Sequence, residues 1–91
     1  MKHMTLPRFW NCYAQLPGEI QKLADKNFKL LKTDPRHPSL HFKQVGRKRK
    51  LWSVRVGDHY RALGDEKPDG IVWFWIGLHA VYDTLLKRKK S

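Results

Sequence analysis

Mostly apolar residues recur at helical spacing in two successive runs along the first third of the chain. Each run follows a proline, Pro7 or Pro17, which suits the first turn of a helix because the N–H it lacks would have no partner there. Pro35 and Pro38 then end the pattern, since proline cannot continue a helix. The spacing predicts two helices within residues 6–33, the second longer. Their inward positions are Phe9, Trp10, Tyr13, Leu16, Ile20, Leu23, Ala24, Asn27, Leu30 and Leu31.

The period of the pattern then changes to two, which is typical of strands. Four segments carry this signal or a continuous apolar run, namely 39–45, 51–56, 59–65 and 71–78. The last of them, "IVWFWIGL", is apolar on both faces, as expected of a central strand. Its two tryptophans, Trp73 and Trp75, are spaced to share one face, and we expect both to pack in the core.

This order of elements predicts an α+β domain with two N-terminal helices packed on a four-stranded antiparallel sheet. The sheet is expected to cover about 39–78, and residues 79–91 to form a short C-terminal helix or tail. A chain of 91 residues is long enough for one small domain, so residues 1–91 are assigned to a single unit.

The hairpin expected in "LWSVRVGDHYRALG" has two candidate registers. With a loop of residues 57–58, Arg61 would face Val54 and share the apolar side of the sheet. With a loop of residues 57–59, Arg61 faces Arg55, and the apolar residues of both strands lie together on the other side. A shift of one residue moves all side chains of a strand to the opposite face, so the buried side selects the register. The longer loop is predicted, with Tyr60 opposite Val56, Ala62 opposite Val54 and Gly64 opposite Trp52.

This register places two positive charges opposite each other, on Arg55 and Arg61, and such cross-strand pairs are destabilising. A bound anion would relieve the repulsion. Phosphate suits this role, because the guanidinium fork matches its oxygens in a bidentate way. The alternative is that the two side chains reach into water or pair with an Asp or Glu.

The charge of the whole chain points to a polyanionic partner. Lys and Arg number 19 against eight Asp and Glu, which gives a formal net charge of +11. Solubility alone needs a magnitude of only about 2–8, so we expect a nucleic acid, ribosome, acidic protein or anionic membrane as partner. Two basic runs are either solvated or contacts to RNA phosphates, and we favour the contacts, which would make binding strongly salt-dependent. The runs are Arg47, Lys48, Arg49 and Lys50, and Lys87, Arg88, Lys89 and Lys90.

Cofactors, export and membrane insertion have no signal in the sequence. Cys12 is a lone cysteine, so no internal disulfide and no zinc-type spacing exist. The first residues lack the apolar core of a signal peptide, and the longest apolar run is too short for a membrane helix. We therefore expect a cytoplasmic protein without metal, other cofactor or membrane partner.

The order of elements, together with "HYRAL" on the third strand and "WIGLHAVYDTLL" at the end of the fourth, resembles the RelE/ParE superfamily of bacterial toxin–antitoxin toxins. The resemblance covers roughly residues 7–86. It implies a compact toxin neutralised by an antitoxin that wraps around it. RelE-like members cut mRNA without metal in the ribosomal A site, whereas ParE-like members lack the cleavage residues and poison DNA gyrase.

The resemblance also implies site residues at Arg55, Arg61, His79 and Tyr82. In RNA the nucleophile is the 2′-OH beside the scissile phosphate, so positioning and electrostatics can supply most of the catalysis. The arginines suit the phosphate, and His79 suits proton transfer near neutral pH. Tyr82 lies three residues further, where it either stacks on a base or orients His79. The alternative is that Tyr82, Val81 and Leu85 only form a ridge that docks the C-terminal segment. Asp83 is a second candidate for orienting His79.

The leading hypothesis is a toxin of a type II toxin–antitoxin system that acts as a metal-independent mRNA endoribonuclease, at the ribosome, and inhibits translation. Its partners would be mRNA, the ribosome and an acidic antitoxin encoded next to it. Two alternatives stay open: a ParE-like, non-catalytic gyrase inhibitor, and a catalytically dead relative that only binds nucleic acid. Ser53 departs from the pattern, because relatives can carry a lysine there, and the "YR" arginine also occurs in gyrase-type members.

Overall fold

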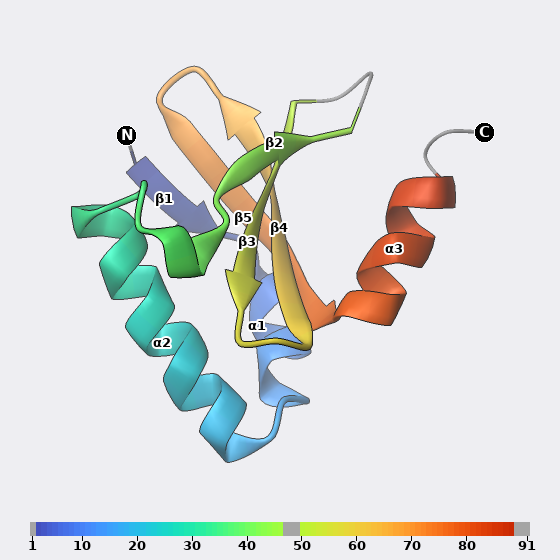
Figure 1. Ribbon diagram of the computed structural model, residues 1–91. Helices are drawn as coiled ribbons and strands as arrows, with labels where there is room; N and C mark the ends of the chain where they lie inside the picture. Colours follow the sequence, from blue (N-terminus) through green and yellow to red (C-terminus); the bar gives the residue numbers. More distant parts are fainter. Residues whose placement is uncertain (1, 47–49, 89–91) are drawn as a thin grey trace.

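The computed structural model describes residues 2–46 and 50–88, with side chains through Leu86. Figure 1 shows a twisted sheet with two helices on one side and a third helix on the other. The elements in chain order are β1 (Lys2–Thr5), α1 (Pro7–Ala14), α2 (Gly18–Thr33), the 3-10 turn η1 (Pro38–Leu40), β2 (Lys43–Val45), β3 (Leu51–Val56), β4 (Tyr60–Lys67), β5 (Gly70–Leu78) and α3 (His79–Arg88). The α+β class and the two N-terminal helices are confirmed.

The sheet has five strands among the described residues, in the order β1-β5-β4-β3-β2, so the predicted count of four is wrong. The additional strand is β1, which pairs in parallel with residues 70–73 of β5, whereas all other neighbours are antiparallel. Its four residues, "KHMT", show no clear alternation, so their pattern carries no strand signal. The pairing becomes visible only once the fold brings β5 to the N-terminal segment.

The strand expected over 39–45 is shorter than predicted. Pro38 begins a 3-10 turn that ends at Leu40, and His41 follows with φ of 44°, in the left-handed region. This conformation turns the chain, so that strand pairing begins only at Lys43. The alternation of apolar residues before Lys43 therefore reflects a turn whose Leu40 is buried in the core, and not a strand.

Helices α1 and α2 pack on one face of the sheet and enclose the main core with it (Figure 1). The residue before α1 is Leu6, and the cap has no side-chain hydrogen bond. Thr5 ends β1, and its hydroxyl accepts a hydrogen bond from the indole Nε1 of Trp10 at 3.0 Å. The buried members of this core are Phe9, Leu16, Ala24, Leu31, Leu40, Val54, Val56, Ala62, Ile71, Trp73 and Ile76.

The register of the β3–β4 hairpin is confirmed. Tyr60 pairs with Val56, Ala62 with Val54, and Arg61 with Arg55. Because directly opposite residues share a face, the apolar partners all face the helices and the two arginines face away from them.

An irregularity in the pairing of β4 with β5 corrects the prediction that both tryptophans of β5 share a face. Trp73 pairs with Gly64 and Trp75 with Leu63, so Phe74 is an extra residue on β5. Such a bulge changes which side the following residues face. Trp73 lies in the main core on the helix side, whereas Trp75 packs against a second apolar cluster on the opposite face.

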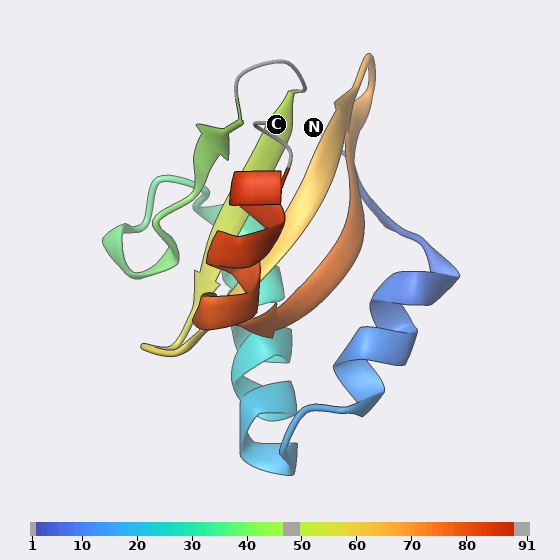
Figure 2. The same ribbon diagram turned by 90° about the vertical axis from the view of Figure 1, so that its right-hand side faces the viewer.

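Helix α3 lies against the face of the sheet that α1 and α2 leave open (Figure 2). Tyr82 is its buried anchor, and it packs with Leu51, Leu63 and Phe74 in the second cluster. Leu85 and Leu86 add partly buried contacts. The segment 79–91, expected as a helix or tail, is thus a docked helix over its described part. No helix within the described ranges is long and apolar enough to cross a membrane.

The histidine of β1 makes the stability of the fold depend on pH. The His3 ring stacks near Trp73, and its Nδ1 accepts a hydrogen bond from the Trp73 Nε1 at 3.2 Å. Burial lowers the pKa of His3 below 6.5, and the positive charge of Lys32 lowers it further. The unfolded chain therefore binds a proton more readily than the native one, so the free energy of unfolding is full above about pH 6.5 and falls as the pH drops toward the lowered pKa.

We expect urea unfolding to show this loss as the pH is lowered below about 6.5. His3→Gln, which does not titrate, should flatten that part of the profile, whereas His37→Gln, at an exposed position, should leave it unchanged. An equal slope in the wild type and His3→Gln would remove His3 as its source.

Candidate functional site

The two arginines predicted as phosphate ligands lie side by side on the α3 side of the sheet. Arg55 on β3 pairs directly with Arg61 on β4, and Arg61 pairs with Gly77 on β5. These three residues form one row across the sheet. Because the β5 member is a glycine, no side chain projects from β5 in this row. Both guanidinium groups therefore project from the same face, at adjacent positions.

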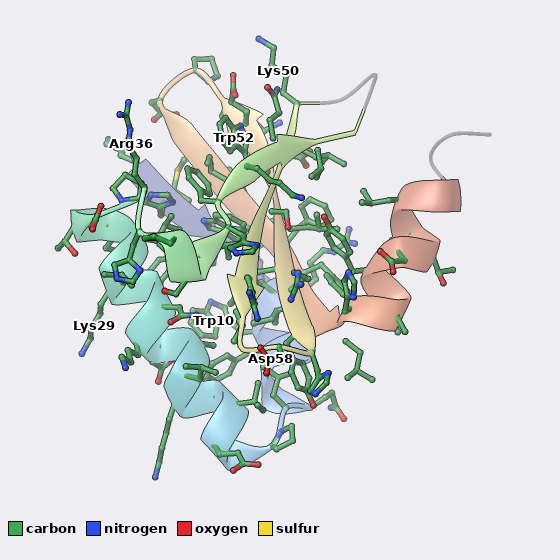
Figure 3. All side chains as sticks on the ribbon, in the orientation of Figure 1. Trp10, Lys29, Arg36, Lys50, Trp52 and Asp58 are labelled. Carbon is green, nitrogen blue, oxygen red and sulfur yellow. The ribbon has the colours of Figure 1, made fainter. Side chains whose placement is uncertain are left out.

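Arg55 is held by the hairpin loop that follows it. Its Nε donates to the carbonyl oxygen of Gly57 at 3.0 Å, and its Nη2 pairs with the carboxylate of Asp58. Its Nη1 lies 3.5 Å from the Nε2 of His41. Asp58 occupies the turn at the end of the hairpin (Figure 3). The pairing with an acid that the sequence left as an alternative thus applies to Arg55, and it fixes the side chain while leaving part of its five N–H groups for an anion.

Arg61 is held differently. Its Nη1 donates to the backbone carbonyl of Tyr60 at 2.8 Å. Among the described residues no carboxylate forms an ion pair with Arg61. The positive charge of this half-buried side chain is therefore balanced less by the protein than that of Arg55, which makes Arg61 the stronger of the two as a ligand for an external anion.

His79 begins α3 directly after β5. Its backbone N–H donates to the carbonyl of His59 at 2.7 Å, which anchors the helix start two residues beyond the row of arginines. The ring Nε2 lies 3.5 Å from the Oδ1 of Asp83, and the His79 side chain is 46% exposed. The Asp83 carboxylate faces the imidazole, which is the position expected of a group that orients His79.

The Tyr82 ring packs against the His79 imidazole. The two rings stack with centroids 5.6 Å apart, and Tyr82 itself is only 6% exposed. A ring buried in this way has little face to offer a base. Of the two roles considered for Tyr82, its position favours orienting His79.

Two further polar residues lie near this site, and the sequence pattern did not single them out. His41 contacts Arg55, and Lys43 lies directly opposite Ser53 on the edge strand β2. Ser53 is 2% exposed and lies in the sheet interior, whereas Lys43 is exposed. A lysine is thus present in the row of Ser53, from the neighbouring strand. The signal available was the alternation around residue 42, but the pairing register of β2 was needed to use it.

The basic runs are described only in part. Lys50 forms an ion pair with Glu66, with 3.7 Å between Nζ and Oε2. Residues 47–49 and 89–90 lie outside the described residues, as do the side chains of Lys87 and Arg88. Within the described ranges, no three His, Cys, Asp or Glu side chains gather in an arrangement that would hold a metal ion.

Three comparisons place this arrangement among known proteins. Residues 19–84 match the family model of the ParE-like toxin domain. Comparison with curated proteins gives no match.

The fold is similar to several solved toxins. RelE in the RelB–RelE antitoxin–toxin complex from Methanococcus jannaschii is 18% identical, with a TM-score of 0.71 over 89% of this chain and 96% of that chain. The archaeal RelE–RelB complex from Pyrococcus horikoshii OT3 is 13% identical, with a TM-score of 0.66 over 85% of this chain and 92% of that chain. The YoeB dimer from Staphylococcus aureus is 12% identical, with a TM-score of 0.66 over 87% of this chain and 97% of that chain. At these identities the structural likeness shows a shared fold. The family model covers most of the chain, and the protein therefore belongs to the family of ParE-like toxin domains, within the RelE/ParE superfamily of toxins.

Proposed function

We propose that this toxin is a metal-independent endoribonuclease that cuts mRNA at the ribosome and so inhibits translation. The observation that carries the proposal is the pair Arg55 and Arg61, which project from the same face of adjacent strands at directly opposite positions. A pair of guanidinium groups matches a phosphodiester and its pentavalent transition state. The start of α3, two residues after the Gly77 that pairs with Arg61, adds His79 and Asp83.

On this proposal the RNA supplies the nucleophile. The 2′-oxygen attacks the adjacent phosphorus, the O2′–P bond forms, and the P–O5′ bond breaks, which leaves a 2′,3′-cyclic phosphate and a free 5′-hydroxyl. Arg55 and Arg61 offset the charge that builds on the phosphate oxygens. His79 either accepts the proton that leaves the 2′-OH or donates the proton that reaches the 5′-oxygen, and water serves the other transfer. Asp83 and Tyr82 hold the imidazole ring in place.

An antitoxin is the second partner that we propose. Two of the similar structures are RelE bound to RelB, an antitoxin–toxin pair. The net charge of +11 favours an acidic partner, since a negative chain would neutralise the basic face and compete with RNA for the arginines.

Gyrase inhibition is the competing function, and the family match favours it because the matching model is that of ParE-like toxins. A gyrase inhibitor needs a binding surface but no proton-transfer group. The placement of His79 beside Asp83 has no use in that function, which is why we rank RNA cleavage first.

The decisive experiment adds the purified protein to a translation reaction and maps the 5′ ends of the mRNA, with and without EDTA. We expect new ends within the translated region in both cases, and a 2′,3′-cyclic phosphate on the upstream fragment. The same preparation is tested for inhibition of DNA supercoiling by gyrase. Intact mRNA together with arrested supercoiling would establish the ParE-like function instead.

A further inference from the structure

The face that carries the two arginines also carries an aromatic ring that takes no part in the proposed cleavage. Trp75 reaches this face because the bulge at Phe74 places it opposite Leu63, on the α3 side. It is half-buried, whereas the other aromatic residues of the second cluster, Phe74 and Tyr82, are 7% and 6% exposed. Of the described aromatic side chains in this cluster, Trp75 is the one with exposed ring surface.

The glycine of the arginine row positions this ring. A β-carbon on Gly77 would lie 2.6 Å from the Cζ2 of Trp75, and 3.2 Å from its Cη2. The six-membered part of the indole therefore covers the backbone of Gly77. Since Gly77 pairs directly with Arg61, the indole lies in the same cross-strand row as the two guanidinium groups.

The space beside the indole is not filled. A cavity of about 90 Å³ is lined by Trp75 and by Leu85 and Leu86 of α3, together with Arg8, Leu51, Leu63 and Phe74. The ring is thus packed against the strand on one side and incompletely covered on the other. A partly buried indole in the row of Arg61 differs from a core tryptophan such as Trp73, which is 2% exposed and uses its Nε1 in a hydrogen bond to His3.

We propose that Trp75 is a stacking platform for a nucleobase of the RNA whose phosphate Arg55 and Arg61 bind, and that Gly77 positions the ring. This inference rests on the proposed function and names a further contact with its substrate. An aromatic ring beside a cationic groove binds single-stranded nucleic acid with little base preference, because every base has a π face. The platform would add an affinity that requires the presence of a base, whatever its identity, to the phosphate affinity that the arginines supply.

The test compares two single-stranded 2′-O-methyl oligonucleotides, which cannot be cut because they lack a free 2′-OH. One carries its bases, and the other has the same backbone with abasic positions. Fluorescence anisotropy at fixed low salt gives both dissociation constants. We expect the wild type to bind the base-carrying strand about tenfold more tightly, the size of one base stacked on an aromatic side chain. Trp75→Leu should reduce this ratio to about one and leave the abasic affinity unchanged.

Three further variants separate stacking from folding. Gly77→Ala should also lower the ratio, because the new β-carbon displaces the indole, and Trp75→Phe should retain most of it because an aromatic face remains. Trp52→Leu is the matched control: Trp52 is also half-buried, but it lies on the helix side of the sheet, so the ratio should not change (Figure 3). If the circular dichroism spectrum of Trp75→Leu differs from that of the wild type, the binding ratios of Gly77→Ala and Trp75→Phe are used to test the platform instead.

The outcomes distinguish this inference from the function on which it rests. A wild-type ratio of one, or a ratio that survives both Trp75→Leu and Gly77→Ala, overturns the platform and leaves Trp75 as a packing residue. Cleaved mRNA with a ratio of one keeps the nuclease and rejects the platform. A base-dependent ratio without mRNA cleavage supports the platform and rejects the nuclease. Loss of affinity for both strands alike in Trp75→Leu would mean that the variant has disturbed the arginines, and it also contradicts the proposal.

Discussion

Arg61→Ala is expected to lower the rate of mRNA cleavage by about 10²–10³-fold, the cost of removing one preorganised donor to a developing negative charge. Arg61 has no carboxylate partner among the described residues, so its guanidinium is the group most available to the phosphate. The fold should be almost unaffected, because the side chain gives up only one hydrogen bond, to the carbonyl of Tyr60. Cleavage is measured by quantifying mRNA 5′ ends in a translation reaction.

Two companion variants show whether the effect is local. Arg36→Ala removes the same charge from an exposed position in the loop after α2, far from the hairpin turn (Figure 3), and should change the rate less than about twofold. Arg61→Lys keeps the charge but loses the planar fork, so we expect it to restore only part of the activity. Equal losses in Arg36→Ala and Arg61→Ala would mean that net charge, and not the paired site, determines the rate.

Trp73→Ala is expected to cost about 3–5 kcal/mol of the free energy of unfolding, which is typical of a large buried side chain replaced by alanine. Trp73 joins three parts of the fold. It pairs with Thr5 of β1 and Gly64 of β4, and its ring contacts His3 and Phe42. Since native domains are stable by only about 5–15 kcal/mol, and small ones lie near the lower limit, the variant should be largely unfolded at room temperature or close to it.

Trp10→Ala is the matched control for that loss. Trp10 is 49% exposed and makes one hydrogen bond to Thr5 together with edge-on contacts to Phe9 and Tyr13. We expect a cost of about 1 kcal/mol. Urea unfolding followed by circular dichroism gives both values, and similar midpoints for the two variants would contradict the assignment of Trp73 to the core.

The parts of the fold that the sequence predicted correctly are those where a buried face permits one answer. The hairpin register followed from the requirement that Arg61 avoid the side of Val54, and the structure has that register. The two helices followed from their apolar spacing and from Pro7 and Pro17. In these cases the local pattern and the tertiary contacts agree.

Features that depend on distant partners were not predictable. Strand β1 exists because residues 70–73 of β5 accept it, and its own four residues give no sign of that pairing. The bulge at Phe74 comes from fitting β5 to β4, and it reverses the face of Trp75. His41 adopts a left-handed conformation between a 3-10 turn and an edge strand, a local geometry that an alternating pattern hides.

For the candidate site, the sequence supplied candidate residues but not their contacts. The sequence and the family resemblance supplied Arg55, Arg61, His79 and Tyr82, and the structure places the first two in one row. The sequence did not indicate that Asp58 would pair with Arg55, because that contact depends on how the three-residue loop folds back. Such a contact belongs to the turn geometry, which periodicity does not encode.

The parallel pairing of β1 with β5 has a consequence for how the molecule is made. Residues 6–69 separate the two paired segments, so β1 closes a long loop, and the conformational entropy of that loop must be lost before the contact stabilises the fold. During synthesis the N-terminal segment leaves the ribosome first, yet it has no partner until β5 has emerged. Completion of the sheet, and of the core around Trp73, is thus delayed until β5 has left the ribosome.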